Sequence, residues 1–87
     1  MANTDLFEFP CRFEVKAMGQ WSSELEDRVS SIVDRHLDGS GILGTSSRLS
    51  RQGNYISVTC VIKARSRAQL DAIYMDLNSE PDIFMTI

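Results

Sequence analysis

The sequence predicts a single α+β domain in which a four-stranded antiparallel sheet carries two helices on one face. Three observations lead to this class. The chain has 87 residues, which is room for one domain with one modest core. Apolar residues alternate with polar ones in three short segments, the pattern of half-buried strands. Two further segments repeat apolar residues every three or four positions, the pattern of amphipathic helices.

The first predicted strand covers residues 11–18, because apolar side chains alternate there with charged ones and give the strand one apolar face. The Gly19-Gln20 pair interrupts this pattern. Ser23 and Glu26 then have the spacing of a capping box, which begins a helix that an Asp-Gly pair ends. The apolar stripe of this helix consists of Leu25, Val29, Ile32, Val33 and Leu37.

The middle of the chain predicts a hairpin. Residues 45–51 are polar apart from Leu49, which suits an edge strand whose hydroxyl and charged side chains discourage further pairing. Residues 52–54 are predicted to form the turn, because glycine and asparagine tolerate positive φ. The most regular strand pattern follows at residues 55–63. Its apolar face is made by Ile56, Val58, Cys60 and Ile62.

The last two elements are a helix and a short strand. Ser66 and Gln69 repeat the capping-box spacing and begin the second helix, which residues 78–81 close. The apolar stripe of this helix consists of Leu70, Ile73, Tyr74 and Leu77. The final short strand is predicted from three alternating apolar residues, Ile83, Met85 and Ile87.

The order of elements decides the architecture. Since each strand has one apolar face, both helices must cover the same side of a single sheet. Right-handed crossovers place the first and third strands at the centre, which gives the strand order 4-1-3-2. The sequence therefore predicts a ferredoxin-like βαββαβ sandwich with one open sheet face. We expect one domain over residues 1–87, with residues 1–10 as an N-terminal extension.

Composition excludes several classes of protein. With 43% hydrophobic and 24% charged residues, the chain is neither a disordered tail nor a coiled-coil rod. No apolar run is long enough to span a membrane and the start of the chain lacks an export signal, so we expect a cytoplasmic protein with no membrane partner. The two cysteines, Cys11 and Cys60, match no metal or redox spacing and are expected to be reduced.

The charges are distributed unevenly along the chain. No acidic residue lies between Gly39 and Leu70, and all twelve carboxylates lie in the flanking segments. Five of the nine basic residues lie in this middle segment, namely Arg48, Arg51, Lys63, Arg65 and Arg67. We therefore expect an electrical polarity, although the net charge of −3 argues against a dedicated nucleic-acid binder.

Several short motifs carry a resemblance through their order and spacing. They are Phe9-Pro10, Lys16-Ala17-Met18-Gly19, Arg35-His36, Gly53-Asn54-Tyr55 and Ile83-Phe84-Met85-Thr86-Ile87. With these motifs the chain resembles the YbeD-like family of small bacterial proteins, from about Leu6 to its last residue. The resemblance implies a ferredoxin-like fold similar to ACT-type regulatory domains. The biochemical function of that family is not established, so the resemblance leaves the function open.

Few residues are suited to catalysis or metal binding. The only histidine, His36, lies in the last turn of the first predicted helix, where a partly charged imidazole interacts favourably with the helix dipole. Cys11 and Cys60 share the inward parity of their strands, where a buried thiol is inert. Neither a phosphate-binding loop nor a zinc-protease motif occurs. We therefore expect no enzyme, no metal site and no cofactor.

The predicted topology gathers two loops at one edge of the sheet, because the first strand ends where the hairpin turns. The residues brought together there are Lys16, Gly19, Gln20, Arg51, Gly53, Asn54 and Tyr55. The first helix begins nearby, and its free N–H groups and positive dipole favour a small anion beside the two cations. We expect this cluster to bind a small anionic metabolite. In the alternative, the cluster only forms turns, covers the sheet face and exposes solvated charges.

Two other functions stay open. The open sheet face is expected to carry an apolar patch that would suit a homo-oligomer or an unidentified protein partner. The patch residues are Met18, Tyr55, Val61 and Phe84. A bare sheet with a basic hairpin also resembles an RNA-recognition module, but Tyr55 is the only aromatic expected on the central strands and Glu14 occupies the first strand, which disfavours nucleic acid. The sequence thus favours a non-enzymatic regulatory or binding module for an anionic ligand, with a protein-interaction adaptor as the alternative.

Overall fold

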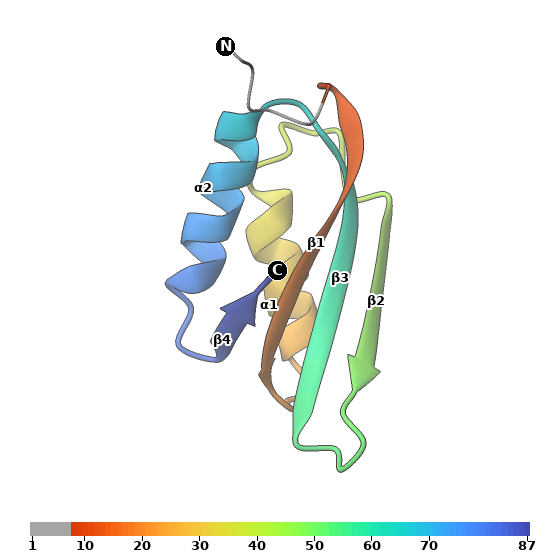
Figure 1. Cartoon of the computed structure of the whole chain (residues 1–87), viewed down its shortest axis with the longest axis vertical. Coiled ribbons are helices and arrows are strands. Elements are labelled where there is room, and N and C mark those ends of the chain that lie inside the picture. Colours follow the sequence, from red (N-terminus) through yellow and green to blue (C-terminus); the bar gives the residue numbers. More distant parts are fainter. Residues whose placement is uncertain (1–7) are drawn as a thin grey trace.

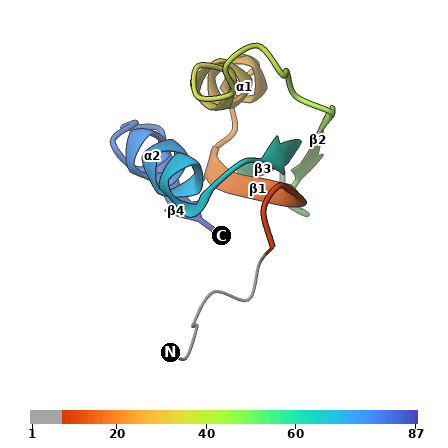
Figure 2. The ribbon, with the colours of Figure 1, turned by 90° about the horizontal axis from the view of Figure 1, so that it is seen from above.

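The computed structural model describes residues 8–87 and contains the six elements in the predicted order (Figure 1). They are β1 (Cys11–Gln20), α1 (Leu25–Asp34), β2 (Gly44–Leu49), β3 (Tyr55–Ala64), α2 (Arg67–Asn78) and β4 (Ile83–Thr86). The strands form one antiparallel sheet in the order β2-β3-β1-β4, which is the predicted order read from the other edge. Both helices lie on one side of this sheet (Figure 2). The ferredoxin-like sandwich is therefore confirmed, while residues 1–7 of the expected N-terminal extension lie outside the described residues.

The core lies between the sheet and the two helices. Every residue predicted for the apolar face of β3 is buried, with Ile56 the most exposed at 7%. The stripe of α1 is buried throughout, and in α2 only Tyr74 of the predicted stripe is partly exposed. Burial of each such side chain stabilises the fold by roughly 1.5–3 kcal/mol. Because this burial uses one side of the sheet, the other side remains uncovered.

The two helices begin differently from one another. At α2 the Ser66 hydroxyl accepts the N–H of Gln69 at 3.1 Å, as predicted. At α1 the predicted Ser23 cap is wrong, because Ser22 accepts the N–H of Glu24 at 3.0 Å instead. β1 continues to Gln20, two residues farther than predicted, and α1 begins at Leu25 with Glu24 at its N-cap. Within residues 8–87, neither helix is long and apolar enough to cross a membrane.

The hairpin between β2 and β3 has a longer connection than predicted. Ser50 closes it, since its N–H donates to the carbonyl of Tyr55 at 2.8 Å and its hydroxyl accepts the N–H of Tyr55 at 3.0 Å. Gly53 has φ of 76°, a conformation that strongly favours glycine. Arg51, predicted at the end of the edge strand, lies in this loop.

A β-bulge interrupts the predicted alternation of β4. Met85 pairs with Met18 and Ile83 pairs with Gly19, so Phe84 is an extra residue on the β4 side. Ile83 is buried, but Met85 is 47% exposed. The prediction that alternating residues of this strand share one face is therefore wrong. As a consequence, Phe84 and Met85 both lie on the uncovered side of the sheet.

The thiol of Cys60 is fully buried in the core, at 0% exposure, and burial raises its pKa. The unfolded chain therefore releases this proton at a lower pH than the folded chain. We expect this contribution to the free energy of unfolding to persist below the ordinary thiol pKa of about 8.5 and to be lost as the pH rises through the higher pKa of the folded state. Urea denaturation between about pH 7 and pH 10 measures it. The decline should be shallower in Cys60→Ala, and an identical pH profile in that variant would contradict the prediction.

Candidate functional site

The open face of the sheet is the side turned away from the helices (Figure 2). The register of the strands identifies the side chains on it. They are Arg12, Glu14, Lys16, Met18 and Gln20 from β1, Ser46 and Arg48 from β2, and Tyr55, Ser57, Thr59, Val61 and Lys63 from β3. These residues occur in rows across the sheet, so positions far apart in the sequence become neighbours.

The open face is predominantly basic. Among the strand side chains that face outward, Glu14 is the only carboxylate, and its ion pairs with Arg12 and Lys16 are long, at 3.8 and 3.9 Å. Arg48 and Arg51 form no ion pair within residues 8–87. The polarity expected from the sequence is therefore present, with unpaired cations on the side of the sheet opposite the helices.

Two adjoining hollows lie on the open face. The larger, which we call the Arg51 hollow, has a volume of about 470 Å³ and is lined by Met18, Arg48, Leu49, Ser50, Arg51, Tyr55 and Ser57. The smaller, the Lys16 hollow, has a volume of about 360 Å³ and is lined by Lys16, Ser46, Ser47, Arg48, Ser57 and Thr59. Arg48 and Ser57 belong to both linings, so one arginine can serve a ligand in either hollow.

Most of the predicted anion cluster lies together at the hairpin end of the sheet. Gln20 pairs with Tyr55, and the carbonyl of Asn54 accepts the N–H of Trp21 at 3.0 Å. Arg51 and Gly53 lie in the same hairpin loop. Lys16 lies farther along β1 and joins this group only through the adjoining hollows, which Arg48 connects. Arg48 was not expected in this cluster, because its position opposite Ser57 depends on the register of the edge strand.

Gly19 faces the helices rather than the open face. A Cβ atom at this position would overlap the carbonyl oxygen of Asp82 and lie 2.8 Å from Cδ2 of Leu25. The residue therefore permits close packing of the segment that leads into β4. Its parity along β1, two residues after the buried Ala17, places it there.

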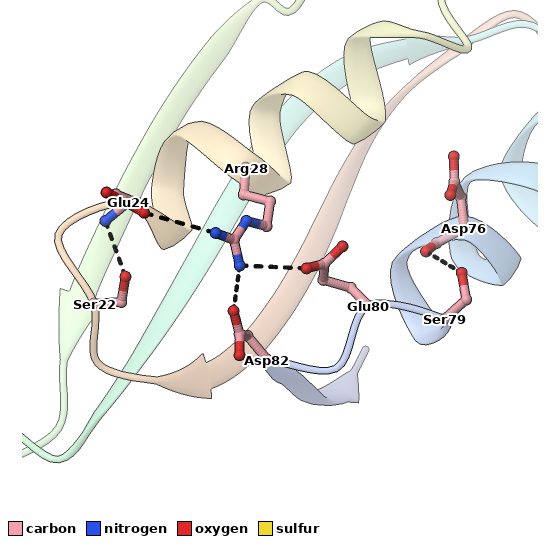
Figure 3. Close-up of polar contacts among 7 residues, drawn as sticks. All are labelled: Ser22, Glu24, Arg28, Asp76, Ser79, Glu80 and Asp82. Carbon is pink, nitrogen blue, oxygen red and sulfur yellow. Dashed lines mark hydrogen bonds and ion pairs between the residues drawn. The ribbon is translucent and has the colours of Figure 1, made fainter.

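The start of α1 is surrounded by carboxylates, as Figure 3 shows. Arg28 reaches Glu24 at 3.7 Å, Glu80 at 3.3 Å, and also contacts Asp82. Inward-facing Gly19 lies against Asp82 and Leu25, so this segment is on the helix side of the sheet, whereas Lys16 faces the other side. The α1 dipole was expected to help bind an anion, but the start of this helix lies beside carboxylates instead. An anion on the open face therefore depends on the cationic side chains there.

An apolar patch lies beside the Arg51 hollow. The rings of Tyr55 and Phe84 meet edge to face, with centroids 5.4 Å apart and planes at 80°. Met18 and Met85 are paired in the neighbouring row. We call Met18, Tyr55, Phe84 and Met85 the aromatic–methionine patch. Val61, which was expected with them, lies farther along β3 beyond Ser57 and Thr59.

The residues considered for catalysis have structural contacts. His36 Nε2 lies 2.9 Å from Asp76 Oδ2, which joins the end of α1 to α2, and Arg35 lies 3.8 Å from the same carboxylate. Cys60 is buried and Cys11 is partly buried. In the part of the chain that the structure describes, no group of three histidine, cysteine or carboxylate side chains could hold a metal ion.

Known proteins are similar to this chain over most or all of its length. A family model described as "Protein of unknown function (DUF493)" matches residues 4–87. A UPF0250 protein of Nitrosomonas europaea is 37% identical over 87 residues, which is 100% of both chains. A UPF0250 protein of Shewanella woodyi is 38% identical over 84% of this chain and 81% of its own length. One from Vibrio cholerae is 40% identical over 84% of this chain and 77% of its own.

Proposed function

Since the chain belongs to the DUF493 family of proteins of unknown function, we propose that it is a non-enzymatic regulatory or binding module whose open sheet face takes an anionic ligand. The family membership also confirms the resemblance drawn from the sequence motifs. One observation carries the proposal. Three cations, Lys16, Arg48 and Arg51, converge on two adjoining hollows whose linings contain no carboxylate.

The chemistry of these side chains suits a carboxylate or a phosphate. A guanidinium group donates a planar fork of hydrogen bonds that matches either anion. Arg48 and Arg51 need not break an ion pair with any residue from 8 to 87 before binding. The pair of Lys16 with Glu14 is long and half-exposed, so it competes weakly. Hydroxyl groups of Ser46, Ser57 and Thr59 add further donors.

The same linings favour binding over catalysis. Neither hollow is lined by a histidine, a cysteine or a carboxylate. Histidine, cysteine and carboxylate side chains are among the commonest general acids, general bases and nucleophiles of enzymes. The serine and threonine hydroxyls of the linings have no histidine or carboxylate beside them to accept a proton. An anion in either hollow would therefore be held rather than converted.

Titration with inorganic phosphate and with citrate tests the proposal. In ¹⁵N-edited NMR spectra of the whole chain, we expect saturable shifts around Arg48, Arg51 and Ser57, which weaken as salt is added. Changing both arginines to alanine should raise Kd about tenfold or more, because two charge-assisted hydrogen-bonding groups are lost. Lys63→Ala is the matched control, since Lys63 lies on the open face but lines neither hollow. An unsaturable response to both anions, or native affinity in the double variant, would refute the proposal.

A further inference from the structure

We propose that the anionic ligand is an acidic segment of another protein, whose apolar side chains pack on the aromatic–methionine patch while its carboxylates meet Arg48 and Arg51. This inference rests on the proposed function, because the same two arginines hold the anion. Its independent basis is the apolar surface beside them. Met18 and Tyr55 belong to the patch and also line the Arg51 hollow. A ligand in that hollow therefore meets apolar and cationic groups together.

The patch is uncovered to an extent that is unusual for such side chains. Tyr55, Phe84 and Met85 are 45%, 54% and 47% exposed. A strand that kept its alternation would turn one of two successive residues inward, but the bulge in β4 turns both Phe84 and Met85 outward. A cluster of exposed apolar side chains with a polar rim is typical of a protein-binding surface. The two methionines can adapt to the shape of a partner.

The charge around the patch specifies the chemistry of the partner. The rim beside the patch carries Lys16, Arg48 and Arg51, and no carboxylate lines either hollow. Complementary charge brings partners together and excludes segments of the wrong sign. An acidic segment with apolar residues can contact both the cationic rim and the aromatic–methionine patch, whereas an inorganic anion can contact only the rim.

A second copy of this chain fits the surface poorly. A two-fold symmetric pair using the open face would bring together two copies of a predominantly basic surface, in which Glu14 is the only outward carboxylate of the strands. In a head-to-tail pair, with the acidic helix side of one copy on the open face of the next, Met75 would be the only large exposed apolar side chain of the two helices available to the patch. The surface therefore favours a different chain.

Single-stranded RNA also carries negative charge, but the aromatic geometry disfavours it. Nucleic-acid platforms stack successive bases on exposed ring faces. In this patch Tyr55 and Phe84 meet at 80°, so the edge of one ring lies against the face of the other. This pair does not offer two parallel faces for neighbouring bases. The ring geometry therefore favours a protein segment over RNA as the partner.

The test selects peptides on the full chain. A library of random peptides about 12 residues long, enough to cross the sheet when extended, is selected on the immobilised protein and sequenced. We expect enrichment of peptides that combine aspartate or glutamate with aromatic or aliphatic residues. The most enriched peptide should bind about fivefold more weakly to Phe84→Ala and about tenfold more weakly to the Arg48→Ala, Arg51→Ala variant. Met75→Ala is the control, because Met75 is 73% exposed on α2 and should not change Kd.

Phosphate titration of the same variants separates this inference from the proposed function. Phe84→Ala should weaken the peptide and leave the Kd for inorganic phosphate unchanged. Saturable phosphate binding without an acidic and apolar consensus would overturn the inference and leave the proposed function standing. Tighter binding of a polyuridine oligomer than of the best peptide, lost in the same variants, would also overturn it, as would a dimer in sedimentation equilibrium that Phe84→Ala dissociates. If phosphate, citrate and every selected peptide fail to bind, both proposals fail.

Discussion

Gly19→Ala is expected to lower the free energy of unfolding by about 3 kcal/mol. The added Cβ would overlap the carbonyl oxygen of Asp82 and approach Cδ2 of Leu25 at 2.8 Å. The Asp82 carbonyl belongs to the backbone next to Ile83, which pairs with Gly19, so relief requires a shift of β4 itself. Domains of this size are stable by only about 5–10 kcal/mol, so the loss is a large fraction of the total. Urea denaturation followed by circular dichroism measures it.

Gly44→Ala is the matched control for this prediction. Gly44 also lies in the sheet, but a Cβ there would meet nothing within 4 Å. The free energy of unfolding of the Gly44→Ala variant should stay within about 0.5 kcal/mol of that of the native chain. Equal losses in the two variants would contradict the prediction, because only Gly19 has a backbone atom in the space that the new Cβ would occupy. A native-like Gly19→Ala chain would show that the segment at Asp82 moves freely.

The predictable part of the fold follows from periodicity. In β3, apolar residues at every second position lie on one face and are buried, because the pleat of a strand alternates its side chains. The stripes of α1 and α2 follow the helical period in the same way. Once each element has one apolar face, few arrangements can bury them all, and the strand order follows.

Local motifs were less reliable where a distant contact competes with them. The alternation of Ile83 and Met85 predicts a regular β4, but the register shift opposite Met18 and Gly19 breaks it. At this point the Asp82 segment lies directly against Gly19 of β1, a contact between distant residues that no short stretch of sequence contains. The Ser23 capping box is also wrong, since Ser22 rather than Ser23 accepts an N–H beside the start of α1.

The candidate site was partly predictable. Lys16, Arg51 and Tyr55 line the two hollows. Their positions could be predicted, because the strand pattern gives the parity of Lys16 and Tyr55 and places Arg51 next to the hairpin turn. The alternation of β1 also places Gly19 with the inward residues, so its absence from the open face can be deduced from the sequence. Arg48 is different, because its role depends on pairing with Ser57 across two strands. The register between two strands could not be read from the sequence and is known only from the structure.

Gln69→Leu is expected to lower the free energy of unfolding by about 2 kcal/mol. Among residues 8–87, Gln69 is the only buried polar residue, at 6% exposure. Its Oε1 accepts the N–H of Arg65 at 2.7 Å, and its Nε2 donates to the carbonyl of His36 at 2.8 Å. The side chain thus ties the start of α2 to the chain that leaves α1. Leucine has a similar volume but leaves both part-buried backbone groups without this partner, which costs more than the net value of a hydrogen bond.

Gln69→Glu tests the two hydrogen bonds separately, because it keeps an oxygen for Arg65 and places a second oxygen against the carbonyl of His36. At neutral pH this variant should lose at least as much stability as Gln69→Leu. In acid, a protonated carboxyl can donate to His36, so the difference from the native chain should shrink. Gln52→Leu, at an exposed loop position, is the control and should change stability by less than about 0.5 kcal/mol. Native-like denaturation curves for both Gln69 variants would mean that water satisfies these backbone groups and that apolar packing alone holds α1 and α2 together.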